Sequence, residues 1–539
     1  MLQDGFFRAS KLEQNMLQQR AKIQWLKGGD QCSRIFFRKV AMRRAAKRVF
    51  QIMNEAGRTL TAHDEVVDEF VAYYQRLLGG ERRREFIDLR YLRSWARHVV
   101  TPDESMALVQ TPTREEIKDA FFDIAEDRRQ ARMATHRVFT KLLGLSLVRR
   151  WLQQSWNSLL QRLRLVLDKM ISPSQNAFVP GRSIGDNILL AQEMFSGYNR
   201  QGLPMRCALK VDLRKAYDTV EWDFLSAVLH LFGFPDIFIG WIEECVSTPM
   251  FSVCINGNPH GFFKGSRGLR QGDPMSPFLF VLIMEVLQLM LQQLIDQNEG
   301  FSFHWRCKEI GLFQLCFADD LLLFCKADVV SVQILRHGLD EFAKLSGLHA
   351  NPQKSQLILS RSAQAMREHL TAALQFQEGH LPLRETSSDQ ISAYVTQCLL
   401  GNGLHLPKGV IRAVEKKMRN FLWKGNSVVG YPKVAWSDVC RPIEEGGLGI
   451  RDILALNKAL MSRHLWNVIQ NNQSSIWVKW ITHTHLRHKS VWTVDLKGGS
   501  GVGGSFFGYD QHLFPTLNLR LVMGNPFLFG MTHGIASAL

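Results

Sequence analysis

Two adjacent aspartates separate two strongly apolar runs near the middle of the chain. Asp319 and Asp320 follow residues 315–318 and precede residues 321–324, and both flanks are almost entirely apolar. Short apolar runs joined by a polar step are typical of a β-hairpin, so we expect a hairpin with the two aspartates at its turn. Two neighbouring carboxylates between buried strands are unfavourable unless a cation neutralises them, and a divalent metal ion explains the pair most simply. An ordinary acidic turn is the alternative.

A third carboxylate ends another predicted strand. Residues 207–212 form an alternating, apolar-rich run with Asp212 at its terminus, from which the side chain can project into a cleft. An aspartate in this setting is also a common helix N-cap. If the strand lies beside the hairpin, Asp212, Asp319 and Asp320 supply oxygen ligands that can hold two Mg²⁺ ions and leave positions for water and phosphate. Two such ions about 3.5–4 Å apart stabilise both oxygens of an in-line phosphoryl displacement.

Composition points to a polyanionic partner. The chain has 539 residues, is 46% hydrophobic and carries a formal net charge of +16, which excludes a disordered chain and favours nucleic acid over an anionic membrane. The nine cysteines form no CxxC or Cys/His cluster, which argues against a disulfide framework and a zinc site. Residues 1–20 lack the apolar core of a secretory signal. We therefore expect an intracellular protein of the nucleus or cytoplasm.

We expect no membrane segment either. Residues 278–294 are the longest apolar stretch, and four polar side chains interrupt it, whereas a membrane span needs about 20 predominantly apolar residues. Between residues 34 and 48, seven cations occur without an acid, which suits phosphate contacts, although a solvated helix surface is the alternative. By composition the chain divides into a basic, mostly helical N-terminal region (1–160), a core that mixes short strands and helices (161–360), a helical region (361–480) and an unassigned tail (481–539).

Five segments occur in an order and at a spacing that resemble one enzyme family. They are Ser174 to Asn187, the run around Asp212, Gly268 to Pro277, Phe317 to Asp320, and Ser346 to Ser355. Taken together, they are similar to reverse transcriptases, and more narrowly to the polymerase of plant non-LTR (LINE-type) retrotransposons. Weaker matches at 25–30, 445–450 and 457–460 extend the resemblance over roughly residues 12 to 470.

The resemblance implies an α+β right-hand polymerase: a palm with an antiparallel sheet, shortened fingers and a helical thumb remnant. It would place partial fingers in residues 1–160, the palm and fingers core of a reverse transcriptase in 161–360, and the thumb-like remnant in 361–480. It implies an RNA-directed DNA polymerase that uses two Mg²⁺ ions (Mn²⁺ possible), an RNA template, a DNA primer and dNTPs, with no obligate protein partner. Asp212 and Asp319 would be metal ligands, and Asp320 would complete the catalytic carboxylates. Lys354 would offer a proton to the pyrophosphate leaving group, although it could equally be a solvated turn residue.

The remaining implied residues would contact nucleotide or template. Tyr217 lies where the family places an aromatic ring beneath the incoming sugar, where it would exclude a 2′-hydroxyl; core packing is the alternative for this ring. Gly272 permits close approach of the backbone, and the Gln271 side chain can reach template or nucleotide. The other three residues implied to bind nucleotide or template are Arg182, Arg270 and Phe317.

The chain also departs from the family pattern. Residues 126–135 replace a Pro-Gly-Pro-Asp-Gly turn of the fingers, an Arg-Pro-Ile segment that helps bind the triphosphate is missing, and residues 385–388 replace a Tyr-Leu-Gly-Val-Pro-Leu thumb box. Phe317 stands where the family has tyrosine. We also expect no endonuclease domain and no Cys/His knuckle. A truncated polymerase with internal gaps therefore competes with an inactive nucleic-acid-binding remnant and with a group II intron maturase-like splicing factor.

Overall fold

The fold is taken from a computed structural model. It describes residues 48–79, 87–110, 148–379, 408–424, 434–472 and 475–487. The predicted features that fall outside these ranges are most of the basic run at 34–48, the altered fingers segment at 126–135, the thumb segment at 385–388 and the tail beyond residue 487.

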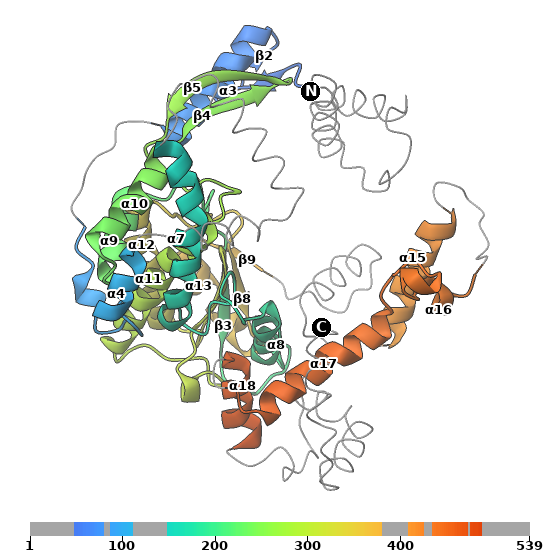
Figure 1. The fold of residues 1–539 in the computed structure, drawn as a ribbon. Coiled ribbons are helices and arrows are strands. Elements are labelled where there is room, and N and C mark those ends of the chain that lie inside the picture. The colour runs from blue at the N-terminus through green and yellow to red at the C-terminus, as the bar shows by residue number, and fades with distance from the viewer. Residues whose placement is uncertain are drawn as a thin grey trace. The chain divides into compact units, whose positions relative to one another are not determined.

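The described chain divides into two compact units, and the first is mainly helical. It draws on residues 1–171, 213–294 and 338–349. Helix α3 lies along the β4–β5 hairpin (Figure 1). Its elements are β1 (Ile52–Met53), β2 (Thr59–Leu60), α3 (His63–Leu78), η2 (Arg90–Leu92), α4 (Pro102–Val109), α7 (Val148–Met170), α9 (Trp222–Leu231), α10 (Asp236–Ser247), β4 (Met250–Ile255), β5 (Asn258–Lys264), most of α11 (Ser276–Asp296) and the end of α12 (Val329–Ser346).

The second unit contains the main sheet. It draws on residues 172–212, 295–337 and 350–539. Its elements are α8 (Ile184–Phe195), β3 (Cys207–Val211), η3 (Lys308–Ile310), β6 (Gln314–Phe317), β7 (Asp320–Cys325), the start of α12, β8 (Gln356–Leu359), η4 (Arg361–Met366), α13 (Arg367–Leu374), β9 (Gln377–Glu378), α15 (Lys408–Lys424), α16 (Trp436–Val439), η5 (Ile443–Glu445), α17 (Ile453–Ile469), α18 (Ile476–Ile481) and the single-turn π-helix η6 (Thr482–Leu486).

The five-stranded sheet has the strand order β6-β7-β3-β8-β9. Strand β3 lies at its centre and pairs antiparallel with β7 and β8, β6 pairs antiparallel with β7, and only β9 adds a parallel edge. Four of the five residues of β3 are buried, which is the pattern of a central strand with both faces covered. The predicted hairpin at 315–324 is confirmed, and the strand predicted over 207–212 is confirmed as β3, which ends at Val211. No helix begins at Asp212, so the N-cap alternative is wrong.

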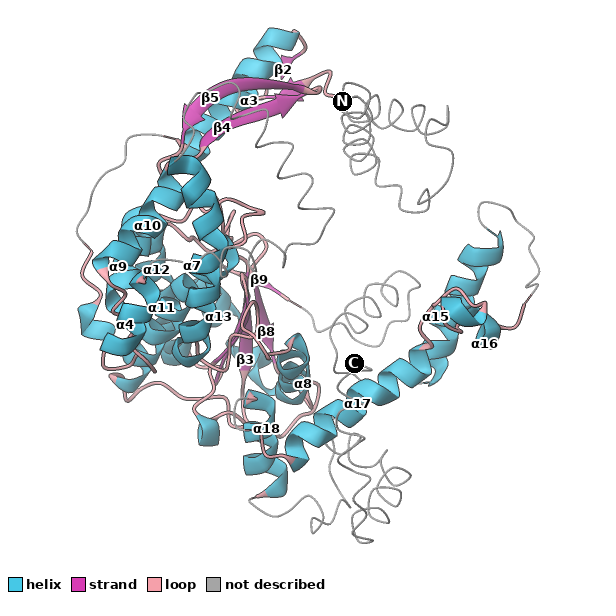
Figure 2. Ribbon diagram, in the orientation of Figure 1, coloured by secondary structure: helices cyan, strands magenta, loops and turns pink. Residues whose placement is uncertain are grey.

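One face of the sheet packs on helices that are distant in the chain. Ala208, Phe324 and Ile358 occupy paired positions on β3, β7 and β8, and they share one buried cluster with α8 and α18. Figure 2 shows α8 and α18 beside these strands. Helix α18 has only six residues, but Trp477 and Trp480 are each only 1% exposed, so this short segment belongs to the core of the unit.

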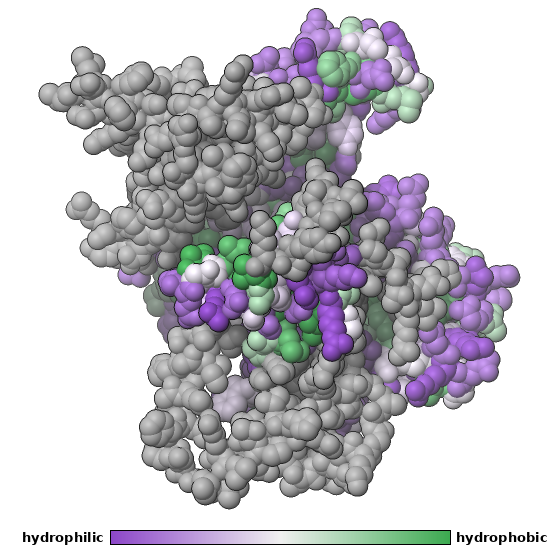
Figure 3. Space-filling view, turned by 90° about the vertical axis from the view of Figure 1, so that its right-hand side faces the viewer, coloured by the Kyte–Doolittle hydropathy of each residue, from purple (hydrophilic) through white to green (hydrophobic). Residues whose placement is uncertain are grey.

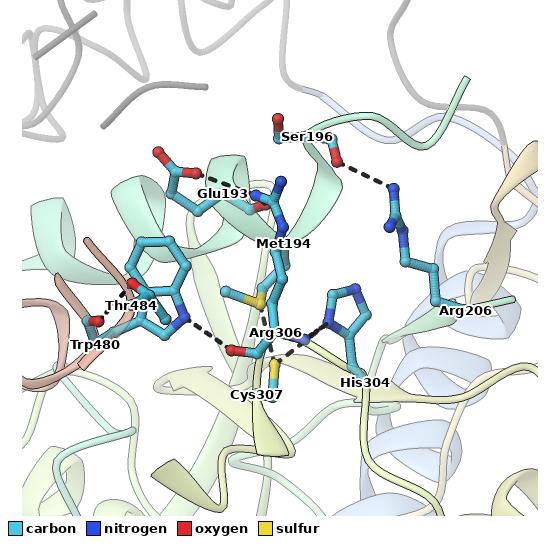
Figure 4. Close-up of polar contacts among 9 residues, drawn as sticks. All are labelled: Glu193, Met194, Ser196, Arg206, His304, Arg306, Cys307, Trp480 and Thr484. Carbon is cyan, nitrogen blue, oxygen red and sulfur yellow. Dashed lines mark hydrogen bonds and ion pairs between the residues drawn. The ribbon is translucent and has the colours of Figure 1, made fainter. Parts of the chain in front are cut away.

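A hydrogen bond and an ion pair connect α18 with the rest of the core (Figure 4). The indole nitrogen of Trp480 donates to the carbonyl of Arg306 at 3.0 Å, and the Arg306 guanidinium pairs at 3.2 Å with the buried carboxylate of Glu193 on α8. Burial lowers the pKa of the neighbouring His304 to about 3, and the charges of Arg206 and Arg306 add to this effect. The imidazole is therefore neutral at physiological pH, so it adds no third positive charge to this site.

Helix α11 in the first unit is long and apolar enough to cross a membrane by length and composition. However, 78% of its most apolar window is buried inside the structure, as in the core helix of a globular unit. Elsewhere the described surface is mixed, and the face in Figure 3 shows small hydrophobic patches among hydrophilic ones. Phe421 on α15, for example, is 85% exposed.

We predict that Trp477→Ala lowers the free energy of unfolding by about 3–5 kcal/mol, because it opens a cavity in the cluster that α18 shares with the sheet. Urea denaturation followed by circular dichroism measures the change. Phe421→Ala, which removes an exposed ring, is the control and should change stability by less than about 0.5 kcal/mol. Equal losses in the two variants would mean that α18 is not part of the core.

Candidate functional site

The register of the central strands brings two of the predicted aspartates together. Val211 pairs with Leu321 in the antiparallel β3–β7 ladder, so one further step along each strand sets Asp212 across from Asp320. Directly opposed residues in such a ladder have Cα atoms about 4.5–5.5 Å apart and point to the same face. The sheet thus brings together two carboxylates that are far apart in the sequence.

The third aspartate lies in the hairpin turn. Phe317 pairs with Asp320, which leaves Ala318 and Asp319 as a two-residue loop. The turn is therefore one residue earlier than the sequence suggested, because Asp320 is already the first residue of β7. Ala318 has a left-handed backbone with φ of 57°, an uncommon conformation for a residue other than glycine. Asp319 is exposed at the end of this turn.

Burial and neighbouring charges act on Asp320. Partial burial raises the pKa of Asp320, the charge of Asp319 raises it further, Lys210 lowers it, and Asp212 raises it again. Lys210 lies two residues before Asp212 and therefore on the same face of β3, and it is exposed. The face thus changes along its length from the apolar cluster at Ala208 to a polar end formed by Lys210, Asp212 and Asp320.

The donor atoms at this polar end fit a hard divalent cation. Carboxylate oxygens are the ligands that Mg²⁺ and Mn²⁺ prefer, and three are available from two strands and one turn. Within the described ranges, however, no three His, Cys, Asp or Glu side chains are grouped closely enough to hold a metal ion. The chemistry of the donors fits a metal, while the side chains as placed do not form a finished ligand set.

A turn beside Asp212 carries Lys354. The Asp212 carbonyl accepts from the Asn351 backbone at 2.7 Å, and the Asp212 backbone donates to the fully buried Ser355 hydroxyl at 3.1 Å. The turn from Asn351 to Ser355 is therefore bound to the end of β3 on both sides. Lys354 is exposed in this turn, one residue from Ser355, so the structure places it next to the candidate site without a direct contact to a carboxylate.

Arg182 has a structural role in this arrangement. One of its guanidinium nitrogens donates to the carbonyl of Ser172, and to that of Gln175 at 2.9 Å. Phe317, which pairs with Asp320, is half-buried. Their predicted contacts with nucleotide or template stay predictions.

The other predicted nucleotide residues belong to the first unit. Tyr217 stacks on Phe280 with ring centroids 4.7 Å apart, and the residue is half-buried. Burial raises the pKa of the adjacent Asp218, and Lys215 and a hydrogen bond from Gln271 at 3.4 Å oppose the rise. Gln271 is thereby linked to Asp218, the residue after Tyr217.

Backbone contacts with residues 217 and 218 hold the loop that carries Arg270, Gln271 and Gly272. The Leu269 amide donates to the Tyr217 carbonyl at 2.6 Å. Gly268 has φ of 91° and lies against Asp218, and a Cβ at this position would come within 2.8 Å of the Asp218 carbonyl oxygen. Only glycine fits there without displacing backbone. Arg270, Gln271 and Gly272 are exposed, as residues that contact a ligand would be.

Two residues of the site were not identified from the sequence. Lys210 shares a face with Asp212, which the period of two in residues 208–212 could have indicated. Ser355 binds the Asp212 backbone across 143 residues of chain, a contact that no local pattern reveals.

Comparison with known proteins finds similar sequences for this region. Residues 145–391 match the family model described as reverse transcriptase (RNA-dependent DNA polymerase). An uncharacterized 149 kDa protein of transposon TX1 from Xenopus laevis is 28% identical over 201 residues, which cover 37% of this chain and 15% of that protein. The Pol polyprotein of a type-1 retrotransposable element R2 from Popillia japonica is 30% identical over 146 residues, 27% of this chain and 23% of that protein.

A third relative belongs to the same kind of element. The Pol polyprotein of the type-2 retrotransposable element R2DM from Drosophila melanogaster is 26% identical over 182 residues, 34% of this chain and 16% of that protein. The chain spans less than a quarter of the length of each of these relatives. They bear out the predicted non-LTR class, while the predicted plant origin stays a prediction.

We predict that Asp320→Asn stabilises the protein at pH 7 in the absence of divalent cations, by no more than about 1 kcal/mol because the carboxyl is partly exposed. The raised pKa means that the folded state binds the proton more tightly than the unfolded state, so the wild-type free energy of unfolding falls as pH rises from about 3.9 through the folded pKa. Urea denaturation at pH 3.5 to 7 in EDTA measures the difference. A gain that is the same at every pH would contradict the assignment.

Proposed function

We propose that this chain, whose residues 145–391 match the reverse-transcriptase family model, has a polymerase palm and acts as an RNA-directed DNA polymerase of the non-LTR retrotransposon class. One observation carries the proposal: the β3–β7 register sets Asp212 across from Asp320, beside the turn that holds Asp319. A palm sheet with carboxylates at the end of its central strands is what nucleotidyl transfer requires.

Reverse-transcriptase domains depend on divalent metal, and the candidate ligands here are Asp212, Asp319 and Asp320. Two Mg²⁺ ions, or Mn²⁺ in their place, would neutralise the charge that develops on the phosphate oxygens during transfer. The protein itself contributes by fixing the backbone of all three ligands. Strand pairing fixes Asp320, backbone hydrogen bonds with Asn351 and Ser355 fix Asp212, and the hairpin turn fixes Asp319.

The substrates we propose are an RNA template, a DNA primer and dNTPs. Lys354, in the turn bound to Asp212, would supply a proton to the pyrophosphate as it leaves. Tyr217 would lie under the sugar of the incoming nucleotide, and Arg270 and Gln271 are exposed on a loop that is bonded to the segment around Tyr217. Positioning by several such contacts accounts for much of the rate of phosphoryl transfer.

The wider architecture that we propose is a right hand with shortened fingers and a helical thumb. Helix α15 suits a thumb that tracks nucleic acid, because its exposed side includes Arg412, Lys416 and Lys417. Exposed lysine and arginine on one side of a helix suit phosphate contacts. The same basic side would serve the second candidate, a nucleic-acid-binding remnant without turnover.

We predict that Asp212→Asn and Asp319→Asn each lower single-nucleotide addition to a DNA primer on an RNA template by at least about 100-fold, because each removes a metal ligand. Primer extension with purified protein, dNTPs and Mg²⁺ measures the rates. Asp236→Asn is the matched control, because this carboxylate is 92% exposed on α10 and should leave the rate unchanged.

The same experiment separates the alternatives. Extension that is equally weak in wild type and Asp319→Asn, together with RNA binding that is strongly salt-dependent and insensitive to Asp212→Asn, would favour the binding remnant. Stimulation of group II intron splicing without primer extension would favour the maturase-like factor.

We predict that Tyr217→Val raises the incorporation of ribonucleotides relative to deoxyribonucleotides by at least about tenfold, because the smaller side chain leaves room for a 2′-hydroxyl. Competing rNTP and dNTP additions on one primer measure the ratio. Tyr217→Phe keeps the ring and should keep the wild-type ratio. If the ratio does not change in Tyr217→Val, the ring serves only to pack against Phe280.

A further inference from the structure

The turn that carries Asp319 depends on an unusual backbone. Ala318 adopts φ of 57° inside a two-residue loop, although a side chain disfavours this region and glycine is the usual choice. A conformation of this kind persists only where the surrounding structure holds it in place. The contacts of the Ala318 amide therefore decide how Asp319 is presented.

Gln175 makes that contact. Its side-chain oxygen accepts from the Ala318 amide at 3.1 Å and from the Ala177 amide at 2.9 Å, and its side-chain nitrogen donates to the Cys316 sulfur at 3.1 Å. Gln175 is only 3% exposed. A buried amide is costly unless it is hydrogen-bonded, and here both ends of the amide are used on or beside the hairpin.

The backbone around Gln175 is rigidly attached to the same hairpin. The Cys316 amide donates to the Ser174 carbonyl at 2.9 Å, and the Cys316 carbonyl accepts from the Asn176 amide at 3.2 Å, so residues 174–176 form a short parallel bridge beside β6. The Asn187 side chain, from α8, donates to the Cys316 carbonyl at 2.8 Å as well. The backbone of Gln175 is therefore fixed beside β6, and its side chain can hold the turn in one position.

We propose that Gln175 is a positioning residue that holds Ala318 in its left-handed conformation and so presents Asp319 for catalysis. The proposal rests on the polymerase function stated above. Gln175 would affect turnover by holding the turn and not by touching substrate. It lies 143 residues before Ala318 in the chain.

The test is a double-mutant cycle between Gln175→Met and Ala318→Gly. Methionine keeps the length and volume of glutamine but cannot accept from the Ala318 amide, whereas glycine adopts a positive φ without help. We expect Gln175→Met to lower kcat for single-nucleotide addition by about tenfold or more, with primer–template affinity within about twofold of wild type. In the Ala318→Gly background the same change should lower kcat by less than about threefold.

A matched control is Gln314→Met, because Gln314 is a glutamine of β6 with 2% exposure that makes no hydrogen bond to Ala318. Its effect on kcat should be the same in the wild-type and the Ala318→Gly backgrounds. If Ala318→Gly fails to reduce the loss caused by Gln175→Met, or reduces the effect of Gln314→Met equally, Gln175 only packs in the core and the proposal is wrong.

A second readout keeps the test independent of the proposed function. The drop in melting temperature caused by Gln175→Met should shrink by at least about 2 °C when position 318 is glycine, whether or not the chain polymerises. Suppose that Ala318→Gly reduces the drop in melting temperature, but Asp319→Asn extends primers as well as wild type does. The polymerase function would then be wrong, while the role of Gln175 in positioning the turn would stand. If Gln175→Met lowers the melting temperature equally with alanine and with glycine at position 318, Gln175 does not position the turn.

Discussion

The pairing of β3 with β7 is the interaction on which the site depends. Residues 207 and 325 begin a five-residue antiparallel ladder that ends at Val211 and Leu321, so the next residue on each strand is an aspartate. A slip of one residue would move every side chain of β3 to the opposite face and would separate Asp212 from Asp320. Such a slip would also move the exposed Lys210 to the face on which Leu209 and Val211 are buried, which disfavours it.

The buried apolar end of the same face holds β3 and β7 in place, and these strands carry the polar end. Ala208, Phe324 and Ile358 pack against α8 and α18, and the indole of Trp480 is bonded to the backbone of Arg306. Partial burial raises the pKa of Asp320, and the charges of Asp319 and Asp212 raise it further. Burial elsewhere in the unit offsets this local cost, in the way that strained or repulsive active sites are commonly maintained.

Part of this arrangement could be predicted from local pattern. The apolar runs around Asp319 and Asp320 predicted a hairpin, and the alternation before Asp212 predicted a strand, because both signals lie within a few residues. The turn was misplaced by one residue, since the left-handed Ala318 depends on Gln175, which is distant in the chain. The burial of α18 was also missed, because a six-residue helix has too little periodicity to identify its partners.

Iron-mediated cleavage of the chain tests the central claim most directly. Fe²⁺ bound in place of Mg²⁺ generates hydroxyl radicals that cut the backbone near the ions, and the cut sites can be mapped by mass spectrometry. The account predicts cuts clustered near Asp212 and near residues 318–320, and their loss both in excess Mg²⁺ and in Asp319→Asn. Cuts confined to other parts of the chain, or cuts unchanged by Asp319→Asn, would contradict a metal site at the end of the β3–β7 ladder.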